Sequence, residues 1–307
     1  MGDTASQRDT APPGPPGAEP APGQPAAAAR APQDADDTRA LHFKRLARHP
    51  VTLSLVLTLA IAALVGATLA ADAIVIGLGA VAAIVLLALL IVFLIASAQA
   101  KEDFFRTYAE ARGLSREERG VLPTGTPLLR RGDDRYAHQI MRGALPGGLE
   151  GAVALYTYED TDTDSEGNRQ TTYYNFTVVI SDVPESAPYV GELYCQRRAG
   201  FRFLDSAEDA FRTRKRVELE SEALDQRCEI FAGRDQDPNW LRQLFDPSFV
   251  YWLGDEAPDG TAFELVAGML CVNVKGHLDS AAELDRVCEA AGAIAQRVRE
   301  ESLETAV

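Results

Sequence analysis

The sequence predicts an α+β protein: a disordered tail, a transmembrane helical hairpin, and then a soluble domain with a mainly antiparallel sheet and a C-terminal helix. Three observations support this. The chain begins Pro/Ala/Gly-rich, it continues into a 48-residue stretch with one charge, and its apolar periodicity then changes from helical to two. Alternating segments that are followed by a terminal helix are typical of α+β domains.

Residues 1–40 form the predicted tail. They include the run APPGPPGAEPAPGQPAAAARAP and contain no Phe, Tyr, Trp, Ile or Val. Such a composition cannot bury enough apolar surface to offset the chain entropy lost on folding. We therefore expect this tail to be disordered.

Residues 51–98 are mostly apolar, and Asp72 is their one charged residue. One helix of this length would measure about 70 Å, against a hydrocarbon core of about 30 Å. Division at Asp72 gives two spans, 51–71 and 73–98, each long enough to cross with some tilt. Because a carboxylate at mid-membrane costs several kcal/mol, we expect Asp72 to mark the turn between the spans.

Basic residues flank both ends of this hairpin and are absent between the spans. Since Lys and Arg near span ends stay on the cytoplasmic side, both termini are predicted to be cytoplasmic, in a multi-pass protein of the bacterial inner membrane. Signal-peptide cleavage within LVGATLAADA is the alternative, and it would leave the second span unchanged. Neither span contains Asp, Glu, Lys, Arg or His, which disfavours a transporter.

The domain is predicted to extend over 101–307. Residues 101–119 read as a helix, which the Ser115 and Glu118 capping box could restart, and a Pro/Gly-broken loop follows. Alternation of apolar, aromatic and β-branched residues then predicts a series of strands. The expected strands are 151–158, 171–180, 189–198, 200–204, 215–221, 227–233, and a hairpin over 261–276.

Two helical regions complete the predicted domain. In 237–255, Asp237 is the expected N-cap, Pro238 the first helical residue, and Pro247 the start of a second short helix. In 279–304, an apolar stripe at helical spacing predicts a helix that packs on the sheet. The stripe consists of Leu284, Val287, Cys288, Ala291, Ile294, Ala295 and Val298.

Two surface clusters are candidates for binding. Residues 101–307 carry 24 Lys/Arg against 38 Asp/Glu, and this net charge of −14 opposes nucleic-acid binding. A local basic cluster could nevertheless face anionic lipid, although solvated charge on strand edges and loops is the favoured explanation. It comprises Arg197, Arg198, Arg202, Arg212, Arg214, Lys215 and Arg216.

The second cluster is aromatic. It could form an exposed patch for a protein partner, or a layer that packs onto the sheet. Its members are Trp240, Phe245, Phe249, Tyr251 and Trp252.

Other constellations give little support for catalysis or for a metal site. Asp160, Asp162 and Asp164 have the spacing of an EF-hand start, but the rest of that motif is missing, so we interpret them as an acidic hairpin tip and leave a surface cation site open. Cys271 and His277 are too few for a zinc site. The four cysteines are expected to be reduced and packed in the core, and no nucleotide-binding or hydrolase motif occurs. They are Cys195, Cys228, Cys271 and Cys288.

Residues 216–255 and 263–276 resemble the ending of uncharacterised actinobacterial two-span membrane proteins with a Pro/Ala-rich tail and a C-terminal cytoplasmic domain of unknown function. The likeness covers roughly residues 45–305. It implies the same architecture and no catalytic residue. The matching positions are Glu218, Glu220, Asp235 to Asp237, Leu244, Phe245, Pro247 and Val274 to Gly276.

Together these observations favour an integral membrane protein whose cytoplasmic domain is an interaction or scaffold module. The expected partners are the lipid bilayer and a protein, and no cofactor is expected. The alternative is a membrane-anchored enzyme that uses Asp/Glu carboxylates, with or without a divalent cation. A transport accessory is a third reading, and it requires a partner that the sequence does not name.

Overall fold

The computed structural model describes residues 74–163, 166–197, 214–219, 221, 224 and 227–306. The expected tail, the first expected span and the strand expected at 200–204 lie outside these residues. The second expected span falls in helix α3, whose side chains are described only in part, from Leu87 onward. Within the described residues, no helix is long and apolar enough to cross a membrane.

Helix α3 (Ile74–Ala111) ends in a Schellman motif. Gly113 takes the left-handed conformation, with φ of +67°. The amide of Leu114 donates to Ala109 O at 2.9 Å, and the amide of Gly113 donates to Glu110 O at 3.2 Å. These bonds satisfy the last carbonyls of the helix, and they turn the chain toward the sheet.

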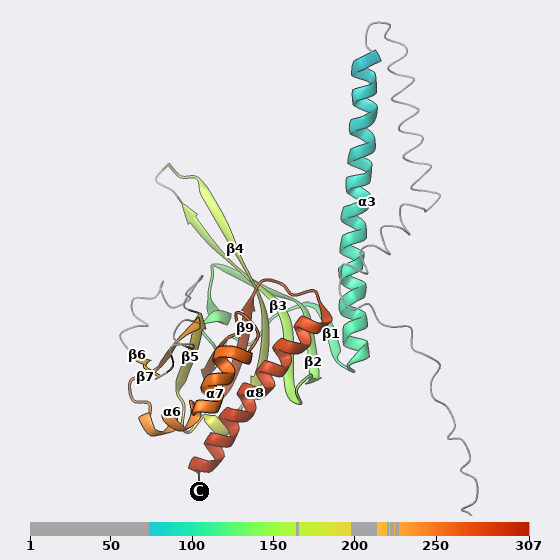
Figure 1. Ribbon diagram of the computed structural model, residues 1–307. Coiled ribbons are helices and arrows are strands. Elements are labelled where there is room, and N and C mark those ends of the chain that lie inside the picture. Colours follow the sequence, from blue (N-terminus) through green and yellow to red (C-terminus); the bar gives the residue numbers. More distant parts are fainter. Residues whose placement is uncertain are drawn as a thin grey trace, which may run out of the picture. The chain divides into compact units, whose positions relative to one another are not determined.

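The described strands form one antiparallel sheet (Figure 1). Their spatial order is β1-β2-β3-β4-β9-β8-β5-β7-β6. The predicted α+β class, with its antiparallel sheet and C-terminal helix, is confirmed. The bounds are β1 (Ser115–Gly120), β2 (Asp134–Leu145), β3 (Leu149–Thr163), β4 (Arg169–Asp182), β5 (Glu192–Arg197), β6 (Arg214–Val217), β7 (Cys228–Gly233), β8 (Ala262–Val266) and β9 (Met269–Lys275).

The prediction that residues 115–119 are helical is wrong, because these residues lie in strand β1. Ser115 does not cap a helix; its hydroxyl donates to Arg142 O at 3.2 Å, across the pair with β2. Pairing along the sheet edge therefore outweighs the local helical signal. Strand β2 itself falls partly in the segment expected to be loop and was not expected from the sequence.

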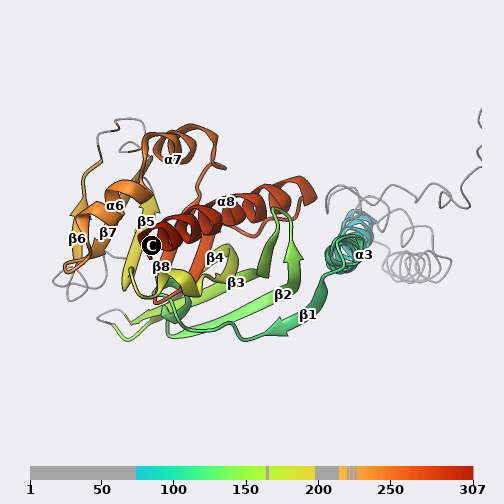
Figure 2. The same ribbon diagram turned by 90° about the horizontal axis from the view of Figure 1, so that it is seen from below.

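Helices cover one face of the sheet. They are α6 (Pro238–Leu244), α7 (Pro247–Tyr251), a π-helical turn (Trp252–Glu256) and α8 (Ala281–Thr305). Figure 2 shows α6, α7 and α8 on the same side of the strands. The predicted apolar stripe of α8 is confirmed, since all seven of its residues are buried, in one cluster with sheet residues such as Phe263 and Val272.

The segment between β1 and β2 packs on the opposite face of the sheet. It contains a short 3-10 helix (Leu128–Arg130), and Leu122, Leu128 and Leu129 are buried with residues of β2, β3 and β4. The hydroxyl of Tyr156 donates to Leu128 O at 3.2 Å. In the middle of the sheet, the side chains on both faces are therefore buried.

The end of α3 is anchored to the domain by apolar and polar contacts. Phe104, Phe105 and Tyr108 are buried in the main core. The Tyr108 hydroxyl and Arg112 Nε each donate to Asp285 Oδ1 of α8 at 2.8 Å. These contacts fix the last turns of α3 against α8.

Candidate functional site

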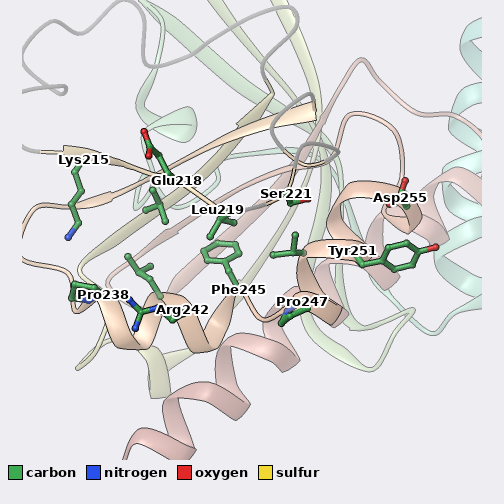
Figure 3. Close-up of a pocket in the computed structure, with 13 residues that line it drawn as sticks. Lys215, Glu218, Leu219, Ser221, Pro238, Arg242, Phe245, Pro247, Tyr251 and Asp255 are labelled. Atoms are coloured by element: carbon green, nitrogen blue, oxygen red, sulfur yellow. The ribbon is translucent and has the colours of Figure 1, made fainter.

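A groove of about 810 Å³ lies between strand β6 with the residues that follow it and helices α6 and α7 (Figure 3). Its lining is mostly apolar. Apolar side chains come from Val217, Leu219, Leu241, Phe245, Val250 and Tyr251. The groove is larger than a second hollow of about 390 Å³ beside Leu122 and Arg142, and we take it as the candidate site.

Two Asp-Pro pairs build the helical wall of the groove. The Asp237 carboxylate accepts from Asn239 N at 2.8 Å, so it caps α6, and Pro238 fills the first helical position. Asp246 accepts from Phe249 N at 2.8 Å and caps α7 in the same way. The sequence signals at Asp237, Pro238 and Pro247 therefore predicted both helix starts correctly.

The cap at Asp246 is also tied to helix α8. Arg297 Nη2 lies 3.3 Å from Asp246 Oδ2, and Arg297 Nε donates to Leu244 O at 3.2 Å. Burial opposes ionisation of Asp246, but hydrogen bonds from Phe249 and Ser248 and the charge of Arg297 lower its pKa. The α6–α7 junction is thus held on a rigid helix, which pre-forms the groove.

Charged side chains mark the two ends of the groove. Figure 3 places Lys215, Glu218 and Arg242 toward one end of the groove, and Asp255 beside Tyr251 at the other. Lys215 Nζ donates to Gln236 O at 3.3 Å, and Arg242 Nη1 donates to Asn239 Oδ1 at 3.1 Å. Both acceptors are neutral, so these bonds leave the positive charges of Lys215 and Arg242 in place.

The aromatic cluster predicted as a partner patch is mostly packed inside. Trp240, Phe245 and Phe249 are buried, and Trp252 is partly buried, with its ring stacked on that of Phe249 at 5.8 Å. Tyr251 alone among the five is exposed, at 59%. The cluster is therefore mainly a layer that packs onto the sheet. Two of its members, Phe245 and Tyr251, also line the groove.

The basic cluster is divided by the fold. Arg198, Arg202 and Arg212 lie outside the described residues, and of Arg197 only the backbone, at the end of β5, is described. The three described side chains alternate across β6. Arg214 and Arg216 project to the face opposite the helices, whereas Lys215 lines the groove.

The two outward arginines of β6 are engaged within the domain. Arg214 Nε lies 3.0 Å from Glu192 Oε2, its Nη2 donates to the Tyr194 hydroxyl at 3.1 Å, and Arg216 Nη1 lies 3.9 Å from Glu229 Oε1. No single basic surface is formed by the described members of the cluster. Lipid contact by this cluster stays a prediction.

Among the described residues, no group of three or more His, Cys, Asp or Glu side chains could hold a metal ion. Asp160 and Asp162 lie on β3 near the hairpin tip, and Asp164 lies outside the described residues. His277 Nε2 lies 3.2 Å from both Thr157 Oγ1 and Tyr156 O, and burial lowers its pKa. All four cysteines are free and buried, as the sequence suggested.

Sequence reasoning missed the carboxyl group of Glu264. It lies on β8, is fully buried, and accepts from Leu128 N at 3.0 Å. Burial raises the pKa of Glu264 to about 7, against weaker opposing effects of the Leu128 hydrogen bond and of Arg214. A pKa near neutrality suits a general acid or base, but this carboxyl is enclosed between the sheet and the 3-10 helix. Its geometry is that of a structural anchor.

Comparison with known proteins gives one structural likeness. No protein-family model matches the chain, and no curated protein matches it significantly. The crystal structure of the mycobacterial trehalose monomycolate transport factor A is similar, with a TM-score of 0.42 and 12% identity, over 66% of this chain and 93% of that one. The groove is therefore interpreted from its own residues.

Proposed function

We propose that the protein is a membrane-tethered interaction module whose domain binds a protein partner in the groove beside β6. The observation that carries the proposal is a pre-formed cavity of about 810 Å³ with an apolar middle and charged ends. Apolar concave surface that is framed by a few polar groups is the usual form of a binding site. The capped helices α6 and α7 hold this surface in place, so little order has to be gained on binding.

An enzyme is the weaker alternative. Two carboxylates, Glu218 and Asp255, line the groove, and Figure 3 places them apart. The buried carboxyl with the raised pKa, Glu264, belongs to the opposite face of the sheet and contacts Leu128. Catalysis by carboxylates needs two neighbouring, accessible carboxyl groups, and these three residues do not provide such a pair.

The membrane tether is proposed from the apolar sequence over 51–98 and from the exposed side chains of α3. Leu87, Leu90, Ile91, Phe93, Leu94 and Ile95 are each 47–58% exposed, an unfavourable state for large apolar groups in water. A hairpin anchor would confine the domain to the bilayer surface and raise its effective concentration toward other membrane proteins. Both termini are proposed to be cytoplasmic, in a bacterial inner membrane.

Topology can be tested with a reporter fused after Val307. Alkaline phosphatase is active only outside the cytoplasm. Green fluorescent protein fluoresces in the cytoplasm, but it does not fluoresce when it is exported in the unfolded state. We expect fluorescence and no phosphatase activity from the two fusions, because arginines flank both ends of the hairpin. The opposite pattern would refute the cytoplasmic placement of the domain.

The groove can be tested by photo-crosslinking of the full chain in living cells. p-Benzoylphenylalanine would be introduced at Tyr251, which lies on the groove and is 59% exposed, and at Tyr173, which lies on β4 and is 58% exposed. The matched exposure of the two tyrosines controls for random collision. We expect one discrete protein adduct from position 251 that is missing from position 173. Identical adduct patterns, or no adduct from either position, would refute the groove as an interaction site.

A further inference from the structure

We infer that the groove beside β6 takes a short peptide segment with an acidic end, one or two large apolar side chains in the middle, and a basic opposite end. This inference rests on the proposed function, because it assigns a chemical class to the partner of the same groove. Three features of the described residues carry it: the apolar middle, the paired cations at one end, and the carboxylate at the other.

The middle of the groove selects apolar side chains. Leu219 and Val250 are half-buried, and Leu241 and Phe245 form its floor, with 4% and 5% of their surface exposed. Figure 3 shows Leu219 beside the ring of Phe245, and Leu219 packs against the core cluster that contains this ring. A Leu or Phe side chain inserted here would lose its contact with water, which is favourable for an apolar group.

The end formed by Lys215 and Arg242 selects carboxylates. Lys215 reaches the groove from β6 and Arg242 from α6, so two positive charges from different elements line the end near Pro238. Their hydrogen-bond acceptors, Gln236 O and Asn239 Oδ1, are uncharged. Glu218 lies in the same half of the groove, but among the described residues it forms no ion pair with Lys215 or Arg242, so an Asp or Glu of the partner can pair with these two cations.

The opposite end sets the direction of the segment. Asp255 lies beside Tyr251, at the far end from Lys215. A Lys or Arg of the partner is favoured there, and a second carboxylate is disfavoured. The total charge of −15 does not cancel this pattern, because charges beyond about 8 Å are screened at physiological ionic strength.

The test is a selection of random dodecapeptides displayed on phage against the full chain in phosphatidylcholine nanodiscs. Empty nanodiscs serve for counter-selection. We expect the wild-type pool to be enriched in peptides with Asp/Glu at one end, Leu or Phe in the middle and Lys/Arg at the other end. Peptides from this pool should bind more weakly as salt is raised.

Charge-reversed proteins give the matched controls. On the double variant Lys215→Glu/Arg242→Glu, the acidic end should disappear from the pool, and wild-type peptides should bind about tenfold more weakly, since each exposed pair contributes up to about 1 kcal/mol. On Asp255→Lys, the acidic end should persist and the basic end should disappear. If a reversed variant does not fold, as judged by circular dichroism, Lys215→Gln/Arg242→Gln replaces it with the same expected direction.

The outcomes separate this inference from the proposed function. A pool that binds wild type but is insensitive to Leu219→Asp would show that the groove is not the binding site, and it would refute both. A groove-dependent pool without acidic residues, or one unchanged on Lys215→Glu/Arg242→Glu, would overturn only the charge pattern. Displacement of the peptides when phosphatidylglycerol is added to the nanodiscs would assign the two cations to lipid and also overturn it.

Discussion

The Trp240→Ala protein is expected to lose about 3–5 kcal/mol of its free energy of unfolding, the usual cost of deleting a fully packed indole. Trp240 is 1% exposed and lies on α6 within the main core. Its removal leaves a cavity beneath the wall of the groove. The measurement is hydrogen exchange of the β8 and β9 amides, in the full chain in nanodiscs, over a denaturant series.

Tyr251→Ala is the control for this prediction. Tyr251 is 59% exposed, so its truncation should change the free energy of unfolding by less than about 0.5 kcal/mol. The same substitution should weaken partner binding, because Tyr251 lines the groove. Equal and small stability losses in both variants would mean that Trp240 belongs to an exposed patch and not to the core.

The contrast between Trp240 and Tyr251 shows where sequence reasoning reaches its limit. Both residues belong to one aromatic run at helical spacing, and the sequence left open whether that run is a surface patch or a buried layer. The helix starts at Asp237 and Pro247 were predictable, because capping is local chemistry. Which side of α6 meets the sheet depends on contacts with residues far away along the chain.

Strand β2 was missed for a different physical reason. A bulge shifts the register between His138 and Met141, and Gln139 adopts a positive φ of 51°. Ala137 and Ile140 therefore pack on one face of the sheet, and Met141 and Leu145 on the other. The buried residues no longer alternate along the strand, so the period of two that identifies strands elsewhere is lost.

The sequence contains a signal for the helix end at Ala111, but the helix was predicted to continue past it. Gly113 provides the left-handed residue that a Schellman motif favours, and Leu114 provides the apolar residue that follows it. The capping-box pattern at Ser115 and Glu118 suggested a new helix at the same place. Residues from Ser115 to Gly120 form a strand and not a new helix, because they pair with the edge of β2.

The groove could not be predicted because its walls come from separate stretches of chain. Lys215 and Arg242 line the same groove only because β6 and α6 come together in the folded domain. In the sequence, Lys215 was grouped with the neighbouring arginines, which strand alternation sends to the opposite face. A charge cluster along a strand is therefore a poor guide to a charge cluster on a surface.

Sequence reasoning missed Glu264 for a related reason. The second prediction with a large effect concerns this residue and the pH dependence of stability. In the run AFELV, alternation places Glu264 on the face opposite Phe263 and Leu265, where a charged residue suggests solvent. The segment with Leu128 covers that face instead. The charged and titratable side chains that act on the carboxyl come from several elements: Arg130, Tyr156, Tyr194, Arg214 and Cys271.

Glu264 is expected to make the wild-type protein less stable as pH rises from 5 to 8. Burial raises the pKa of Glu264 from 4.5 to about 7, so the folded state keeps a proton that the unfolded state releases at lower pH. Stability from this group is complete below pH 4.5 and is lost progressively as pH approaches and passes 7. The loss between pH 5 and 8 amounts to roughly 2–3 kcal/mol.

Glu264→Gln isolates this effect, because glutamine keeps an oxygen that can accept from Leu128 N and cannot ionise. The free energy of unfolding of each protein would be measured at pH 5 and pH 8, in the same nanodiscs. All other titrating groups contribute equally to both proteins, so the variant should lose roughly 2–3 kcal/mol less than wild type over this range. Equal losses would mean that Glu264 is already ionised when folded. A buried carboxylate in that state needs water or a cation beside it, and the enzymatic alternative would then regain a candidate acid.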